Sequence, residues 1–297
     1  MPEAAAGRGM RMGVVGHPRY TVLSHALARL LAFADGQGIR VLLEEPLLDE
    51  APGRTPLTPE DCESLDLLVT LGGDGTLLRG ARLVAGCSVP VLGINLGHLG
   101  FLTSAAPEDA EAAVAAFFAG QTVMEDRMAL SVRAVTAAGE VCGEFLALND
   151  AVLHKGGVAR MIRLLVSARD EEVGSYSADG IILATPTGST AYSLSAGGPI
   201  VSPGLDCIIA TPISPHTLAV RPLVLPAHET ITVEVLSPSE ELLLTIDGQE
   251  DRRLEPGDRI TVRRADSPVR LVRFPGQTFF STLRQKLRWG DLVERER

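Results

Sequence analysis

The feature that most constrains the fold is a glycine-rich pentapeptide, Gly72-Gly73-Asp74-Gly75-Thr76. An apolar run, residues 65–71, precedes it, and residues 77–85 have the composition of a helix. A strand, a glycine turn and a helix in this order direct backbone N–H groups toward an anion, and glycine allows close approach to a phosphate. We therefore predict a phosphate-binding turn at Gly72, Gly73, Gly75 and Thr76, with Thr76 as the helix N-cap. The alternative is a tight connection that binds no ligand.

The acidic residue of this turn, Asp74, points to more than phosphate binding, because a carboxylate is a poor choice for holding a phosphate. A carboxylate suits three other tasks: binding a sugar hydroxyl, removing the proton of that hydroxyl, or holding a magnesium ion. Asp74 is therefore the candidate catalytic residue of the chain.

The first part of the chain alternates between expected strands and helices, which is typical of a parallel sheet covered by helices. Ligands in such sheets bind at the carboxyl ends of the strands, where both the pentapeptide and a second glycine-rich turn, residues 93–102, are expected. His98 in the second turn is a candidate ligand or base, although local hydrogen bonding is the simpler interpretation. Residues 1–9 are expected to be disordered and residues 44–59 to form a loop. The expected strands are residues 12–16, 40–43, 66–71 and 89–93, and the expected helices are residues 22–33, ended by Gly36 and Gly38, and 107–118.

After residue 123 the pattern changes to many short strands separated by turn residues, which predicts a mainly antiparallel second domain. The expected strands are residues 130–135, 142–147, 161–168, 181–184, 230–235, 241–246 and 259–264. Residues 281–289 look helical and are expected to pack back on the first domain. The predicted organisation is an N-terminal α/β domain (1–125), a C-terminal β-rich domain (126–275) and a returning C-terminal segment (276–297).

Polar residues gather at three places in the second domain. Asn149 and Asp150 close one strand, although such a pair is often only a turn. Residues 185–195 hold seven hydroxyl side chains around a predicted helix start, more than one cap requires, and Tyr192 adds a ring that can stack on a base. Asp247-Gly248-Gln249 is most simply a hairpin turn.

Composition excludes several classes of protein. The chain has 297 residues and a formal net charge of −10, which disfavours a broad nucleic-acid surface but not a local anion site. Its four cysteines, Cys62, Cys87, Cys142 and Cys207, are far apart without CxxC spacing, so we expect buried free thiols in a reducing cytosol. Neither a secretory leader pattern nor an apolar stretch of about 20 residues is present, and a cytoplasmic location is expected.

Taken in order, these motifs resemble those of the bacterial NAD kinases. The resemblance rests on the pentapeptide, Asn95-Leu96-Gly97, Asn149-Asp150, residues 185–198, residues 212–218 and Arg221-Pro222-Leu223, and it extends over residues 12–289. The pentapeptide alone is shared with diacylglycerol kinases, sphingosine kinases and phosphofructokinases. The 185–198 segment is highly specific, and it narrows the resemblance to the NAD kinases.

The resemblance implies transfer of the ATP γ-phosphoryl group to the adenosine ribose 2′-hydroxyl of NAD, with Mg²⁺ and in a homodimer or homotetramer. It implies Asp74 as the general base beside the ribose, and Asp179 toward the nicotinamide. Family members commonly have glutamate where this chain has Asp150, so one ribose contact is expected to differ. The implied NAD-binding residues are Gly75, Asn149, Asp150, Asp179, Thr187, Thr190, Ala191, Tyr192, Ser195, Asp247 and Gln249.

Three rival functions make different demands on the sequence. A lipid kinase with the same turn would need an apolar pocket or a membrane-binding face, and the acidic chain offers no basic amphipathic helix. A dinucleotide sensor would be expected to lack the acid at Asp74. A serine hydrolase using Ser189 or Ser195 with His216 lacks a Gly-x-Ser-x-Gly elbow. The absence of a Walker A lysine disfavours a P-loop kinase. The sequence leaves open ATP against polyphosphate as donor, NAD against NADH as acceptor, and feedback by NADP(H).

Overall fold

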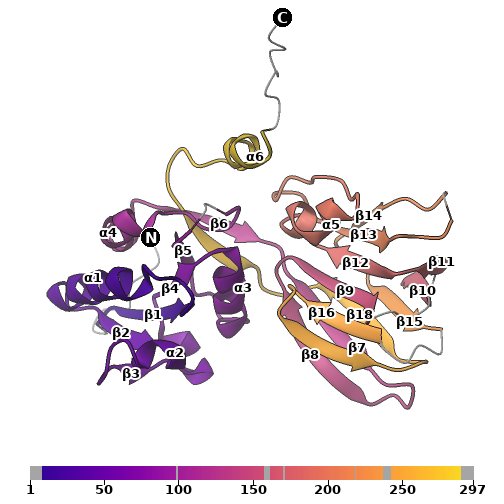
Figure 1. Cartoon of the computed structure of the whole chain (residues 1–297), viewed down its shortest axis with the longest axis horizontal. Coiled ribbons are helices and arrows are strands. Elements are labelled where there is room, and N and C mark those ends of the chain that lie inside the picture. Colours follow the sequence, from indigo (N-terminus) through magenta and orange to yellow (C-terminus); the bar gives the residue numbers. More distant parts are fainter. Residues whose placement is uncertain are drawn as a thin grey trace, which may run out of the picture. The chain divides into compact units, whose positions relative to one another are not determined.

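The computed structural model describes residues 9–97, 100–156, 161–169, 171–217, 219–236 and 242–288. The chain forms two compact units, Met1–Asp126 with Val269–Arg297 and Arg127–Pro268. Their helices and strands are labelled in Figure 1. The interpretations given above for residues 1–8, His98 and Trp289 lie outside the described residues.

The first unit is built on a seven-stranded sheet whose central strands are buried apolar runs. The pairs from β3 through β2, β1, β4 and β5 to β19 are all parallel, as expected for strands buried on both faces. The strand order is β3 (Thr55–Pro56), β2 (Arg40–Leu43), β1 (Arg11–Gly16), β4 (Leu67–Gly72), β5 (Val91–Asn95), β19 (Val269–Arg273) and β6 (Val123–Arg127).

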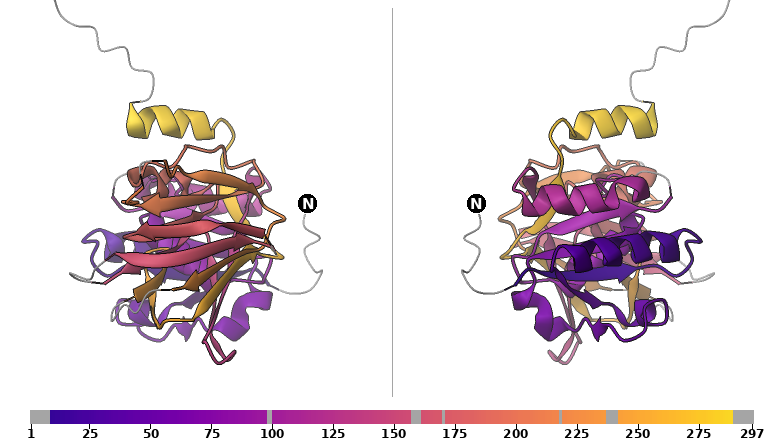
Figure 2. Two further views of the ribbon diagram at one scale, coloured as in Figure 1. Left: turned by 90° about the vertical axis from the view of Figure 1, so that its right-hand side faces the viewer. Right: turned by 90° about the vertical axis from the view of Figure 1, so that its left-hand side faces the viewer.

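Helices cover both faces of this sheet. Leu27 and Leu30 of α1 and Val114 of α4 belong to the core cluster that includes Val69 of β4, and Figure 2 (right) shows α1 and α4 side by side. On the other face, Gly80 of α3 lies against Thr70 and has no room for a side chain. The helical elements are α1 (Leu23–Gly36), α2 (Glu45–Leu48), η1 (Pro59–Ser64), α3 (Asp74–Leu83), η2 (Pro107–Asp109), α4 (Ala110–Phe118) and α6 (Phe279–Leu287).

The second unit contains two six-stranded sheets, each with antiparallel pairing (Figures 1 and 2). Alternate residues of both sheets, such as Leu164, Val233, Leu153 and Leu244, share one apolar core. The first sheet has the order β11 (Glu171–Ala178), β10 (Ile162–Ala168), β15 (Ile231–Val235), β18 (Arg259–Arg264), β7 (Leu130–Val135) and β8 (Val141–Ala147). The second has β14 (Leu223–Pro226), β13 (Cys207–Ile213), β12 (Gly180–Ala184), β9 (Asp150–Lys155), β16 (Leu242–Ile246) and β17 (Glu250–Leu254).

The predicted fold class, a helix-flanked parallel sheet followed by a mainly antiparallel β region, is confirmed. Two details differ. Residues 44–59, expected as a loop, contain α2 and the short edge strand β3. The return to the first unit begins at β19, before the predicted position 276, because Leu271 pairs with Val91 of β5. Gln277 also binds this unit, donating from Nε2 to the Ser104 carbonyl at 2.6 Å.

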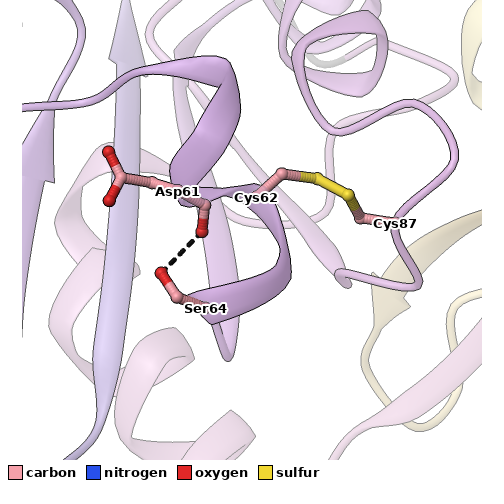
Figure 3. Close-up of a disulfide and its surroundings, with 4 residues drawn as sticks. All are labelled: Asp61, Cys62, Ser64 and Cys87. Carbon is pink, nitrogen blue, oxygen red and sulfur yellow. Dashed lines mark hydrogen bonds between the residues drawn. A yellow bond between two sulfur atoms is a disulfide. The ribbon is translucent and has the colours of Figure 1, made fainter.

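The prediction of free thiols is wrong for two of the four cysteines. Cys62 in η1 and Cys87 after α3 form a disulfide, with Cα atoms 6.2 Å apart (Figure 3), whereas Cys142 and Cys207 are free. The pairing follows from the supersecondary structure. α3 runs back along β4, so the start of the strand and the end of the helix come together despite a separation of 25 residues. The spacing of the cysteines in the sequence does not indicate this pairing.

Within the described part of the chain, no helix combines the length and the apolar character needed to cross a membrane.

Candidate active site

The glycine turn of the first unit joins β4 directly to α3. Gly73 is the residue before the helix, Asp74 is the first helical residue and Thr76 is the third. The predicted N-cap role of Thr76 is therefore wrong; the side chain of Thr76 is instead buried against Gly72, where a Cβ would overlap its hydroxyl. Gly75 is exposed in the first helical turn, so the turn presents backbone rather than side chains.

The carboxylate of Asp74 is held by backbone amides from the segment after β5. Oδ2 accepts from the Phe101 N–H at 2.7 Å, and Oδ1 accepts from Leu102 and Thr103 at 3.1 and 3.3 Å. Gly100 permits this approach, because a Cβ there would overlap the carboxylate. Charge-assisted bonds from three rigid amides fix both the position and the orientation of the carboxylate.

The two glycine-rich turns lie side by side, as the parallel sheet predicts. The Leu96 N–H donates to the Gly72 carbonyl at 3.2 Å. The Asn95 side chain turns back on its own loop, donating to the Gly97 carbonyl at 3.0 Å. Asn95 therefore shapes the second turn.

In the second unit, Asp247 organises the end of a neighbouring strand. Its carboxylate accepts from the backbone N–H groups of Leu148, Asn149 and Asp150 at 3.1, 2.8 and 3.1 Å. Asp247 and Gly248 both have positive φ, 51° and 64°, which is the geometry of a type I′ hairpin turn between β16 and β17. The carboxylate of Asp247 is thus engaged with backbone.

Asp150 is a buried acid beside this carboxylate, with 4% of its surface exposed. Burial, reinforced by the negative charge of Asp247, raises the pKa of Asp150 to about 7. Near neutral pH this carboxyl group is therefore present in both forms, and its protonated form can donate a hydrogen bond.

Most hydroxyls of the Thr185–Ser195 segment are bonded within the fold. Thr185 donates to the Leu148 carbonyl at 2.6 Å, Ser189 donates to the Pro186 carbonyl at 2.6 Å, and Ser193 bonds Thr211 at 2.9 Å.

The turn around Thr187 is held in a similar way. Arg127 Nη1 donates to Thr187 Oγ1 at 3.2 Å, and Thr190 donates to the Thr187 carbonyl at 3.2 Å. The number of hydroxyls therefore reflects the folding of a tight turn that approaches Asn149, where Gly188 leaves no room for a Cβ.

A pocket of about 310 Å³ lies beside these strand ends in the second unit. The structure brings together five of the predicted NAD-binding residues in it. The side chain of Tyr192 is 46% exposed there, which leaves a face open for stacking. The lining residues are Asn149, Asp150, Val152, His154, Ala191, Tyr192, Thr245, Asp247 and Gly248.

The remaining predicted residues of this unit lie outside the pocket lining. Asp179 pairs with Lys155 at 2.7 Å, and both side chains are about one-third exposed. Thr187 is buried in its turn, Ser195 is exposed at the end of α5 (Tyr192–Ser195), and Gln249 is exposed in the hairpin turn.

The sequence interpretation missed two polar lining residues, His154 and Thr245. His154 Nε2 lies 2.9 Å from Thr245 Oγ1, and the same hydroxyl donates to Asp251 at 2.9 Å. The available signal was the alternation of Asp150, Val152 and His154, which places the three side chains on one face of β9.

A dedicated metal cage is not found among the described residues, since no group of three or more His, Cys, Asp or Glu side chains could hold an ion. The carboxylate of Asp74 already has three amide donors. The described residues therefore do not fit a resident metal.

Comparison with known proteins identifies the family to which the chain is similar. Residues 21–122 match the ATP-NAD kinase N-terminal domain family and residues 148–274 match the ATP-NAD kinase C-terminal domain family. The chain is 50% identical to an NAD kinase of Gemmatimonas aurantiaca, over 97% of this chain and 99% of that protein. It is 42% identical to an NAD kinase of Geobacter sulfurreducens, over 89% and 93% of the two chains.

Solved structures of an NADH kinase and an NAD kinase are also similar to this chain, at lower sequence identity. A yeast NADH kinase complexed with NADH superimposes with a TM-score of 0.89 and 28% identity, covering 98% of this chain and 91% of that one. An NAD kinase from Archaeoglobus fulgidus in complex with ATP gives a TM-score of 0.74 at 30% identity, covering 94% and 99%. With both domain families matched in order, and a relative half identical over nearly its whole length, the chain belongs to the NAD kinase family.

Proposed function

We propose that this chain transfers the γ-phosphoryl group of ATP to the adenosine ribose 2′-hydroxyl of NAD and releases NADP. The observation that carries the proposal is the carboxylate of Asp74, fixed by three backbone amides at the start of a helix that follows a glycine turn. Family membership and the relatives named NAD kinase support the choice of substrates.

In this proposal Asp74 is the general base. Phosphoryl transfer depends on in-line positioning and charge neutralisation more than on covalent help from the protein. A carboxylate locked by amides at 2.7, 3.1 and 3.3 Å needs no reorganisation when it orients a hydroxyl and accepts its proton. Base catalysis of this kind contributes about 10²–10⁴-fold to the rate.

We assign the second-unit pocket to the adenosine part of NAD. The exposed ring of Tyr192 offers a stacking face for the base, and Asn149 with Asp150 offers polar atoms for the ribose. Asp247 is a positioning residue, because its carboxylate holds the strand end that carries these two residues. Thr187 and Thr190 act in the same indirect way, through the turn that Arg127 braces.

Phosphate binding is assigned to Gly72, Gly73, Gly75 and Thr76, which form the turn and the first helical residues of α3. We propose that magnesium arrives bound to ATP as part of the substrate, since this ion is commonly held by substrate phosphates and water. Polyphosphate remains an alternative donor and NADH an alternative acceptor.

We further propose a cytoplasmic homodimer or homotetramer. Edge strand β14 exposes Leu223 and Val224, at 37% and 49%, which suits a contact between copies of the chain. The Cys62–Cys87 disulfide is an exception to what this location predicts, since such bonds are rare and mostly transient in a reducing compartment. Light scattering on the purified protein measures the oligomer directly.

The test is NADP formation by the purified protein with ATP, magnesium and NAD, beside the isosteric variant Asp74→Asn. We expect NADP from the wild type and a loss of about 10²–10⁴-fold in kcat from the variant. Asp49→Asn, an exposed position in the same unit, is the matched control and should retain full activity. Near-normal turnover by Asp74→Asn would remove Asp74 from the role of base. If the wild type phosphorylates neither NAD nor NADH, with ATP or with polyphosphate as donor, the proposed function is rejected.

A further inference from the structure

The strand that returns from the end of the chain to the first sheet brings an arginine to the segment after β5. Arg273 is the last residue of β19, and its side chain is only 12% exposed. Its Nη2 donates to the Phe101 carbonyl at 3.0 Å, and its Nη1 donates to the Leu102 carbonyl at 3.0 Å. Nη1 also donates to the Thr103 carbonyl at 3.4 Å. One guanidinium therefore binds three consecutive carbonyl groups.

Two of the peptide groups that bind Arg273 also carry amides that bind the Asp74 carboxylate. The Phe101 carbonyl and the Leu102 N–H belong to one peptide group, and the Leu102 carbonyl and the Thr103 N–H belong to the next. Each carbonyl accepts from Arg273, and each N–H donates to Asp74 Oδ1, at 3.1 and 3.3 Å. In a trans peptide group the carbonyl and the N–H point in opposite directions, and the described chain has no cis bond. The guanidinium and the carboxylate are therefore joined through two rigid peptide planes.

This arrangement acts on the Asp74 carboxylate in two ways. The planar fork of the guanidinium, fixed on neighbouring carbonyls, prevents the peptide planes from rotating, and rotation would turn their N–H groups away from Asp74. A positive charge at the carbonyl oxygen also polarises the peptide group, so that the N–H on its other side becomes a stronger donor. A neutral amide in place of the guanidinium would provide neither the fork nor the charge.

The guanidinium of Arg273 is itself held in place. Its Nε donates to Glu125 of β6 at 2.8 Å, and this ion pair balances its charge. Ser104 Oγ accepts from Nη1 at 3.2 Å and donates to the Val272 carbonyl at 2.6 Å. The ion pair uses only Nε, so both Nη groups serve the segment after β5. Arg273 is therefore a fixed link between β6 and that segment.

We propose that Arg273 is a positioning residue for the carboxylate of Asp74. It fixes and polarises the peptide groups whose N–H groups bind the carboxylate, and it takes no part in proton or phosphoryl transfer itself. This inference rests on the proposed function, in which Asp74 is the general base. It also gives the return of the chain to the first sheet a role in catalysis, because β19 carries Arg273 to this place.

A double-mutant cycle tests whether Arg273 acts through Asp74. Arg273→Gln should lower kcat for NADP formation about 10–100-fold, the effect of misplacing a reacting group, and change the KM for ATP and for NAD less than about twofold. In the Asp74→Asn background the same substitution should lower kcat no further, because the base that it positions is already absent. An equal loss in both backgrounds would show that Arg273 acts independently of Asp74 and would overturn the proposal.

The matched control is Arg270→Gln in the same strand. Arg270 is 44% exposed and pairs with Asp126 at 3.6 Å, so its substitution removes an equivalent ion pair between β19 and β6. It should leave kcat unchanged, and a loss as large as that of Arg273→Gln would overturn the proposal. If Arg273→Gln does not fold, Arg273→Lys enters the same cycle with a smaller expected loss, because it keeps the charge but not the planar fork.

Hydrogen exchange gives a readout that needs no activity. The amides of Leu102 and Thr103 should exchange about tenfold faster in Arg273→Gln than in the wild type, the effect of weakening one charge-assisted hydrogen bond. Leu68 of β4, which is buried in the same unit, is the reference and should exchange at the same rate in both proteins. Equal acceleration at all three amides would show a general loss of stability and would overturn the proposal.

These measurements separate the inference from the proposed function. NADP formation by the wild type, with an unchanged kcat in Arg273→Gln, would refute the inference and leave the function intact. If the wild type forms no NADP, the function fails, whereas faster exchange at Leu102 and Thr103 in Arg273→Gln would still support the positioning of the carboxylate by Arg273.

Discussion

The disulfide gives the most quantitative prediction, because the loop it closes is known. Cys62 and Cys87 are 25 residues apart, and the loop between them contains β4, the glycine turn and α3. Cross-linking a loop of this length removes about 12 cal/mol/K of entropy from the unfolded chain, or about 3.5 kcal/mol at 25 °C. We expect the reduced protein, or Cys87→Ser, to lose about this much free energy of unfolding in the first unit.

Hydrogen exchange measures the loss within one unit of a chain that has two. The amides of Leu68 and Val69 in β4 are buried and exchange only through large openings of the first unit. A loss of 3.5 kcal/mol should speed their exchange about 300-fold. Amides of Ile181 and Leu183 in β12, in the second unit, are the internal reference and should not change. Cys142→Ser, which removes a free thiol, controls for the substitution itself.

Two results would refute the reasoning. Equal exchange of β4 amides in oxidised and reduced protein, with the bond confirmed by mass, would show that the reduced unfolded chain is already constrained. Faster exchange in both units at once would show that they unfold together, and the loss could not then be attributed to the first unit. Both results are visible in one experiment.

Two further predictions concern the carboxylates. Gly100→Ala should lower kcat about 10²-fold, because the added methyl group would displace the Asp74 carboxylate, whereas Gly36→Ala, at a position with open space, should have no effect in the same assay. Folding raises the pKa of Asp150 from 3.8 to about 7, so the native state loses stability as the pH rises from about 4 through 7. Asp150→Asn cannot titrate, and its stability relative to wild type should therefore increase by up to about 4 kcal/mol over this range in urea unfolding; parallel pH profiles would contradict the assigned pKa.

The fold class could be predicted because each sheet has its own periodicity. Continuous apolar runs such as residues 67–71 identify strands buried on both faces, and alternation in residues 130–135 identifies strands with one buried face. The strands that escaped include the buried β13 (Cys207–Ile213) and the exposed β17. β17 (Glu250–Leu254) is exposed along most of its length and reads as a polar loop. Its pairing with β16 stabilises it, and that pairing depends on a hairpin turn rather than on its own composition.

The return of the chain to the first sheet could not be predicted from the sequence either. β19 (Val269–Arg273) reads as one more strand after β18, and nothing local shows that it joins the first sheet. Its partner, β5, lies more than 170 residues earlier, and pairing at such a separation is decided by the tertiary fold. The free-thiol prediction failed for the same reason, since only the assembled β4–α3 unit brings Cys62 to Cys87.

The acidic residues of the motifs show a deeper limit of reading function from sequence. Asp74 and Asp247 stand in different units and different motifs, yet each carboxylate accepts three backbone N–H groups from a distant segment. Backbone donors have no signature in a sequence, so an acid that organises a loop cannot be distinguished there from an acid that binds a ligand. The two carboxylates also differ in where they lie and in what they hold in place. Asp74 is held at the glycine turn that opens α3, whereas Asp247 fixes the strand end that carries Asn149 and Asp150. In the proposed function, the same hydrogen-bonding arrangement therefore serves the general base in one unit and the adenosine pocket in the other.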